Sequence, residues 1–223
     1  MENLYDKNGL IFWNQEEIKL RRMLEDYFSA EILSSLRKQN PAFQMMQVEA
    51  PTMIPKELIN KNYTEEDVWS FGDLALRPET TAGSYLYAKY IMSGYYEIKQ
   101  KPPIVIYQHG KSYRREQDSS LNKMRLKEFY QLEFQIIFGA TTLNDYSLKL
   151  YPDVCNAISN MIGPCRMELS DRLPDYSEET MDIICNKSDM EVCSMSKRKD
   201  LEGYKVIEIA IGTDRCLYNF KNK

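Results

Sequence analysis

Residues 110–138 read GKSYRREQDSSLNKMRLKEFYQLEFQIIF and are the most informative part of this chain. They predict two strands, Ser112–Glu116 and Lys127–Phe138, joined by a polar loop. Along the second strand apolar and polar side chains alternate, which places the two kinds on opposite faces of a sheet. The polar face carries Phe129, Gln131, Glu133 and Gln135.

The polar face of this hairpin has two interpretations. It is the solvated side of an antiparallel sheet, as such faces usually are. Alternatively, it is a binding surface that could hold an anion, a flat ring and an ammonium group, together with Arg114 and Glu116 of the first strand. The rest of the chain favours the second interpretation.

Length and charge restrict the class of protein. The 223 residues predict one domain, with or without a small insertion. The net charge of −4 and the pI near 5.3 are not those of a general nucleic-acid binder, which needs clustered Lys and Arg. We therefore expect no DNA partner, and any RNA contact must use a local patch.

Cysteine use and hydropathy indicate the compartment. The five cysteines have no CxxC spacing, and the only histidine, His109, is far from them in sequence, so a zinc site is not expected. An odd number of cysteines suits a reducing cytoplasm. There is no apolar run near 18 residues and no signal peptide, so we expect a soluble, cytoplasmic protein without a membrane partner.

The first part of the chain predicts a helix followed by a strand. Asn14 is a suitable N-cap, and a buried stripe at four-residue steps continues to about Lys38. Phe43–Glu49 is strand-like, and Pro51 interrupts it. A long helix, a strand and a proline are typical of an interface-forming unit, although a plain helix-to-strand connection gives the same pattern. We expect a homodimer built on Gln15–Pro51.

The remaining segments predict an α+β fold, with an antiparallel sheet flanked by helices. An extended segment, Trp69–Arg77, precedes a helix that begins at Glu79–Thr80. Glu79 is either an ordinary acid of the first helical turn or part of a charged pair at the helix N-terminus. The other predicted elements are a strand at Ile104–His109, a helix from Thr142 or Asn144 to Gly163, strands at Cys165–Ser170, Thr180–Cys185, Met190–Ser194 and Val206–Ile211, and a final turn or helix at Gly212–Arg215.

Three segments resemble the signature motifs of class II aminoacyl-tRNA synthetases, in the correct order. The helix–strand–proline unit is similar to the first motif. Tyr113-Arg114-Arg115-Glu116, followed by Arg125-x-Lys127-Glu128-Phe129, resembles the second, and Glu208–Arg215, EIAIGTDR, resembles the third. The likeness extends from about residue 9 to the end of the chain and is greatest to the glycyl enzymes. This resemblance implies a class II catalytic core, ATP and Mg²⁺ as cofactors, and a ligase activity.

Two shorter segments also resemble the glycyl enzymes. LRPETTAG at Leu76–Gly83 is similar to the glycyl LRPETAQG and also to the histidyl LRPEGTAG. Tyr176–Ile183 looks like a YSxxTxDI strand, and Glu191 and Arg198-x-Asp200 fit the next part of the same pattern. The departures are Ala210, where glycyl enzymes usually have serine, Lys127 in place of an arginine, and Thr81-Ala82 in place of Ala-Gln. The chain stops eight residues after Arg215, so we expect no anticodon-binding domain.

The resemblance also implies roles for individual residues. Arg114 and Arg215 would be catalytic, Arg114 on the α-phosphate and the attacking carboxylate. The ATP-binding residues would be Arg114, Glu116 at the adenine amino group, Arg125 and Arg215 at the terminal phosphates, Phe129 stacked on the adenine with Arg215 above it, and Glu208 as a Mg²⁺ ligand. The amino-acid-binding residues would be Glu79 and Glu133, which hold the ammonium, and Ala210, which closes the pocket.

Each of these residues has a structural alternative. Arg125 and Lys127 could be a solvated loop end, and Phe129 could belong to the core. Glu133 could pair with Arg114, and Glu208 could be a charge on an edge strand.

Three functions remain open at the level of sequence. The first is activation of glycine or another small amino acid with transfer to a tRNA or tRNA-like acceptor. The second is the same activation with transfer to an acceptor that is not a tRNA. The third is a non-catalytic paralogue that serves as an accessory subunit. The retained arginines Arg114, Arg125 and Arg215 weigh against the third.

Overall fold

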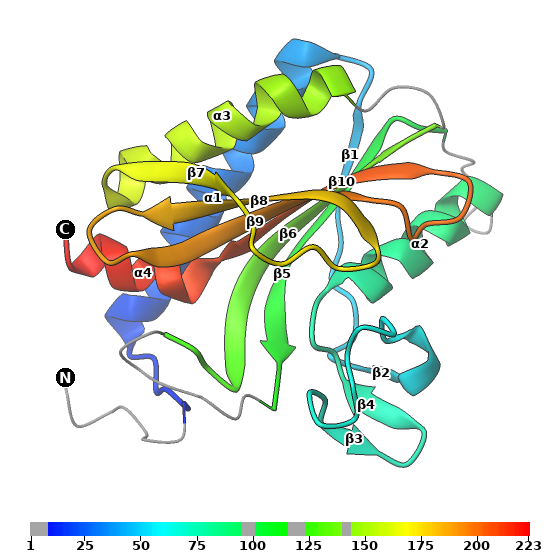
Figure 1. Ribbon diagram of the computed structural model, residues 1–223, viewed down its shortest axis with the longest axis horizontal. Coiled ribbons are helices and arrows are strands. Elements are labelled where there is room, and N and C mark those ends of the chain that lie inside the picture. The colour runs from blue at the N-terminus through cyan, green and yellow to red at the C-terminus, as the bar shows by residue number, and fades with distance from the viewer. Residues whose placement is uncertain (1–8, 95–100, 116–123, 140–143) are drawn as a thin grey trace.

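The fold is built around one seven-stranded sheet in a computed structural model that describes residues 9–94, 101–115, 124–139 and 144–223 (Figure 1). The strand order is β1-β5-β6-β10-β9-β8-β7. Only the β1–β5 pair is parallel among the described pairs of this sheet, which confirms the predicted antiparallel architecture. The strands are β1 (Gln44–Gln47), β5 (Ile104–Tyr113), β6 (Glu128–Phe138), β7 (Cys165–Leu169), β8 (Ser177–Cys185), β9 (Met190–Arg198) and β10 (Lys205–Gly212).

Helices cover both faces of the sheet, as Figure 1 shows. α1 (Gln15–Gln39), α3 (Asn144–Ile162) and α4 (Thr213–Lys221) pack on one face and share the largest core with it. α2 (Thr81–Ser93) packs on the other face, where Ala88 and Ile91 contact a smaller core. None of the helices in the described ranges is both long and apolar enough to cross a membrane.

The long first helix forms as its sequence predicts. Asn14 caps it through a reciprocal pair of hydrogen bonds with Glu17, in which each side chain accepts from the other residue's backbone N–H. Leu24, Phe28 and Leu36 lie on the buried stripe and are fully buried. This face anchors α1 to the sheet.

Two predicted segments differ from the structure. Trp69–Arg77 is not one extended segment, because Gly72 adopts a φ of +62° and turns the chain between β3 (Ser70–Phe71) and β4 (Leu74–Leu76). These strands form a small sheet with β2 (Met53–Pro55), which precedes a short 3₁₀ helix, η2 (Lys56–Leu58). The strands predicted at Ile104–His109 and Ser112–Glu116 form a single strand, β5, as far as Tyr113, and Glu116 lies outside the described residues.

The polar face of β6 is buried rather than solvated. Gln131, Glu133 and Gln135 are each at most 4% exposed. They lie opposite Gly212, Ala210 and Glu208 of the central strand β10, which also rules out the edge-strand interpretation of Glu208. A polar surface is therefore enclosed at the centre of the sheet, on the α2 side.

The five cysteines lie on the opposite side of the sheet from this polar surface. All are free, and four of them, Cys155, Cys185, Cys193 and Cys216, are buried in the core shared with α1, α3 and α4. Cys165 is partly buried against the same core. Burial raises the pKa of Cys165 to about 11 and also raises that of Cys155.

Candidate functional site

A cavity of about 410 Å³ lies over the polar centre of the sheet. Its wall contains every predicted site residue that the structure describes, although these residues come from six separate parts of the chain. Glu116 lies outside the described residues. The predicted residues that line the cavity are Glu79, Arg114, Arg125, Phe129, Glu133, Glu191, Glu208, Ala210 and Arg215.

Arg114 lies just beyond the end of β5, between two aromatic rings. Its guanidinium carbon is 5.2 Å from the centre of the Phe129 ring and 5.5 Å from that of Tyr63. Nε donates to the carbonyl of Pro78 at 3.1 Å, and Nη2 donates to the hydroxyl of Tyr63 at 3.0 Å. The guanidinium is thus fixed in orientation at the cavity wall.

Arg215 is in the first turn of α4, where the predicted Gly-x-x-Arg turn places it. Its Nη1 donates to the carbonyl of Glu191 at 2.9 Å, and its Nε donates to that of Met124 at 3.4 Å. The preceding residue, Asp214, is buried and accepts from the backbone N–H of Tyr130 at 2.7 Å. This bond ties the start of α4 to β6, beside Phe129.

Phe129 has both of the roles considered for it. It lines the cavity, and it also packs against a small apolar cluster that contains Met124, Leu126 and Met190. The cation positioned over its ring is Arg114, whereas the resemblance implies that Arg215 lies above the adenine. Arg125, predicted at the terminal phosphates, is half-buried in the cavity wall.

Glu133 lies on the cavity floor and also binds the start of α2. Its carboxylate accepts from the backbone N–H of Thr80 at 2.9 Å, and it has short contacts with the Thr80 hydroxyl and the Gln131 amide. Burial, together with the nearby Glu208 and Glu79, raises the pKa of Glu133 to about 8. Burial also raises the pKa of Glu79.

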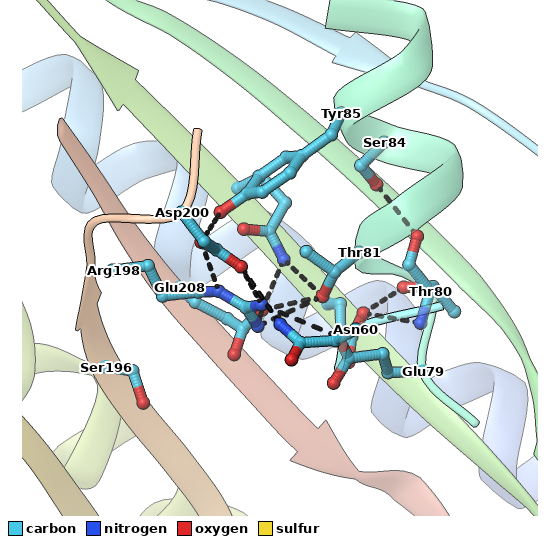
Figure 2. A network of polar contacts seen from close by, with 12 residues as sticks. Asn60, Glu79, Thr80, Thr81, Ser84, Tyr85, Ser196, Arg198, Asp200 and Glu208 are labelled. Carbon is cyan, nitrogen blue, oxygen red and sulfur yellow. Dashed lines mark hydrogen bonds and ion pairs between the residues drawn. The ribbon is translucent and has the colours of Figure 1, made fainter. Parts of the chain in front are cut away.

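Glu208 and Glu79 flank the buried guanidinium of Arg198 (Figure 2). Arg198 Nη1 is 2.7 Å from Glu208 Oε2, and its Nη2 is 3.5 Å from Glu79 Oε1 and 2.6 Å from Asp200 Oδ2. Arg198 is only 1% exposed, so these acids compensate a charge that would be costly to bury alone. Arg198 and Asp200 belong to the segment that resembles the glycyl enzymes, but the resemblance assigned them no role.

One carboxylate oxygen of Glu208 is fully engaged within the protein. Its Oε2 accepts from Thr81 Oγ1 at 2.8 Å and Gln135 Nε2 at 2.7 Å, in addition to the Arg198 ion pair. A cation at this oxygen would have to displace the guanidinium. Within the described ranges, no group of three or more His, Cys, Asp or Glu side chains is arranged to hold a metal ion.

Two tyrosines of the cavity wall were not identified from the sequence. Tyr63 joins Arg114 to Glu79 through its hydroxyl. Tyr176 was noted only as part of a strand-like segment, and its ring stacks on Arg198 with 4.0 Å between the guanidinium carbon and the ring centre. Neither residue lies in one of the three motifs, so motif spacing could not have found them.

Comparison with known proteins identifies the fold. No family model matches the sequence, and no curated protein matches it. The antiparallel sheet with its flanking helices and central polar cavity has the fold of class II aminoacyl-tRNA synthetase catalytic domains.

Two of the similar solved structures are of pyrrolysyl-tRNA synthetases from one organism. The pyrrolysyl-tRNA synthetase of Desulfitobacterium hafniense superimposes with a TM-score of 0.63 at 21% identity, over 89% of this chain and 70% of that chain. A second structure, of Desulfitobacterium hafniense PylSc, gives a TM-score of 0.62 at 21% identity, over 88% and 68% of the two chains. These likenesses confirm the predicted fold class, and the function has to be argued from the site.

Proposed function

We propose that this protein activates an amino acid with ATP and transfers the aminoacyl group to a tRNA or tRNA-like acceptor. The observation that carries the proposal is a shared cavity lined by Arg114, Arg215, Phe129, Glu79 and Glu133. In the activation step a carboxylate oxygen attacks the α-phosphorus of ATP, and the bond to pyrophosphate breaks. Two anions must meet, so the main requirements are charge neutralisation and alignment.

The cavity residues divide this task between them. Arg114 would hold the α-phosphate and the attacking carboxylate, since its fixed guanidinium offers a fork of donors. Arg215 and Arg125 would bind the terminal phosphates, and the adenine would lie on Phe129. Glu116, which lies outside the described residues, would accept from the adenine amino group. ATP would arrive as its Mg²⁺ complex, with the ion carried by phosphate oxygens.

The proposed amino acid is glycine or another small one. Glu79 and Glu133 would hold its ammonium group, and two carboxylates on one ammonium suit a substrate with little side chain to bind. Ala210 lies directly opposite Glu133 across the β6–β10 pair, where its methyl group limits the neighbouring space. Since one methyl group gives about 1–3 kcal/mol of discrimination, we expect glycine first and alanine or serine as weaker substrates.

Amino-acid-dependent ATP–pyrophosphate exchange with each of the twenty amino acids tests this function. We expect exchange with a small amino acid, and a loss of about 100-fold or more in Arg114→Ala, because that variant loses stabilisation of the transition state. The control is Arg166→Ala, which removes an arginine on the outer strand β7 whose ion partners are Glu168 and Asp189.

Three results would contradict the proposal in different ways. Near-normal exchange in Arg114→Ala would remove the α-phosphate role. Histidine as the best substrate would make the histidyl likeness of Leu76–Gly83 the better guide. No exchange with any amino acid would favour a non-catalytic protein of this fold.

A further inference from the structure

We propose that Tyr63 is a positioning residue for the amino-acid substrate, because its hydroxyl lies between the guanidinium of Arg114 and the carboxylate of Glu79 and keeps the two from pairing directly. This inference rests on the proposed function. It assigns a role to the irregular segment between η2 and β3, which contributes to none of the three motifs.

The hydroxyl of Tyr63 forms a hydrogen bond on each side. It accepts from Arg114 Nη2 at 3.0 Å and donates to Glu79 Oε2 at 3.0 Å, as a single hydroxyl group can. Arg114 and Glu79 are close enough for the guanidinium to influence the Glu79 carboxylate electrostatically. Glu79 is only 8% exposed, and opposite charges attract more strongly where a side chain is shielded from water. Glu79 Oε1 already lies 3.5 Å from Arg198 Nη2, so without the hydroxyl its Oε2 would be drawn to Arg114 and both groups would offer less charge to a substrate.

An α-amino acid offers Arg114 an acceptor and Glu79 a donor, as this hydroxyl does. Its carboxylate accepts hydrogen bonds, which suits Arg114, and its ammonium donates them, which suits Glu79. Both groups belong to the main chain of every amino acid. Tyr63 is therefore expected to affect how tightly an amino acid binds, with little effect on which amino acid is chosen.

The segment that carries Tyr63 forms hydrogen bonds on both sides of the cavity. On one side Asn60 Nδ2 donates to Asp200 Oδ2 at 3.2 Å, beside the Arg198 network (Figure 2). On the other side the backbone N–H of Arg115 donates to the carbonyl of Asp67 at 2.9 Å. Arg115 directly follows Arg114, so this hydrogen bond holds the segment that carries Tyr63 in a fixed position relative to Arg114.

The phenol remains neutral under ordinary conditions. Burial raises the pKa of Tyr63 well above its usual value, and Glu79 adds to this effect, whereas Arg114 opposes it. A neutral hydroxyl can donate to Glu79 throughout the neutral pH range. The bridge therefore does not depend on titration of Tyr63.

Tyr63→Phe tests the inference because it removes the hydroxyl and keeps the ring against Arg114. In ATP–pyrophosphate exchange we expect KM for the best amino acid to rise about tenfold or more, as for loss of a hydrogen bond to a charged group. KM for ATP should rise much less, by no more than about twofold, since Phe129, Arg125 and Arg215 would hold the rest of the nucleotide and Arg114 is the proposed ATP contact that this hydroxyl touches. A general loss of structure would raise both KM values and lower the melting temperature.

Tyr146→Phe is the matched control. It removes a hydroxyl that accepts one hydrogen bond from Asn40 at 3.2 Å, on the face of the sheet that α1, α3 and α4 cover, away from the cavity. Both of its KM values should equal those of the wild type. An unchanged amino-acid KM in Tyr63→Phe, or an equal rise in both KM values, would overturn the role of Tyr63 and leave the proposed function intact. A wild-type protein without exchange activity would overturn both.

Discussion

Glu133 shows how burial determines the charge of a single group in the cavity. Its pKa is raised to about 8, so at neutral pH much of the carboxyl group is protonated in the unliganded protein. A protonated carboxyl cannot form an ion pair with an ammonium group. Binding of an amino acid at this position must therefore compete with a proton.

We expect KM for the amino acid to fall as pH rises from about 6 to about 8.5, because the ionised form of Glu133 becomes more populated. Measurement of both KM values across this range checks it. In Glu133→Gln the dependence should flatten, since an amide does not titrate. A wild-type KM that is constant with pH would contradict the role of Glu133.

The same shift has a consequence for stability. The ordinary glutamate pKa of 4.5 applies to the unfolded chain, and the folded value is about 8, so between these limits the folded protein binds more protons. The contribution of Glu133 to the free energy of unfolding is therefore present below the lower limit and is lost as pH rises towards the upper one. Urea unfolding of the wild type and Glu133→Gln at several pH values measures this loss.

The residues of the cavity divide into those that sequence could identify and those that it could not. The cavity wall contains Arg114, Phe129, Glu133 and Arg215. Alternation along β6 determines the direction of Phe129 and Glu133, the pairing of β5 with β6 brings Arg114 beside them, and the turn before α4 places Arg215. Tyr63 lies in a segment without periodicity, so nothing in its neighbourhood indicates the direction of its side chain.

The N-terminus of α1 is the element whose stability is most directly testable. Asn14→Ala removes the side-chain half of the capping box, and we expect the free energy of unfolding to fall by about 1 kcal/mol. Glu31→Ala, on an exposed position within the same helix, is the control and should change stability by less than about 0.5 kcal/mol. Equal stabilities of the two variants would show that the cap contributes little.

At the scale of elements, the helices were predicted better than the short strands. Capping residues and a four-residue stripe mark α1, whereas the turn in Trp69–Arg77 depends on the left-handed conformation of one glycine, Gly72. β5 continues through Gly110 without a break, and a Cβ at this position would lie 2.2 Å from the Arg77 guanidinium. Glycine at this position permits a close approach and does not end the strand.

For the molecule as a whole, we expect a homodimer built on Gln15–Pro51. β1 is at the edge of the seven-stranded sheet, so one of its sides has no partner strand in that sheet among the described residues. Sedimentation at micromolar concentration should give twice the mass of the 26.3 kDa chain. Met23→Glu, at a 40% exposed position on α1, should weaken association about tenfold or more.

Leu148→Glu is the control for association, because Leu148 is an exposed apolar residue of α3, outside the proposed interface. It should leave the mass in solution unchanged. A monomer at micromolar concentration, or equal weakening by both substitutions, would contradict an interface on Gln15–Pro51.

The separation of the thiols from the cavity allows ligands to be found without any assumption about the reaction. Four of the five cysteines are buried behind the sheet, and none of the five lines the cavity. A thiol reagent can reach those four only when the protein unfolds locally or globally. The rate at which these thiols are labelled therefore reports how readily the protein unfolds. A compound that binds only the closed protein slows this labelling in proportion to its saturation and never competes with the reagent for space. Nucleotides, amino acids and acceptor oligonucleotides could all be ranked by the protection that each gives.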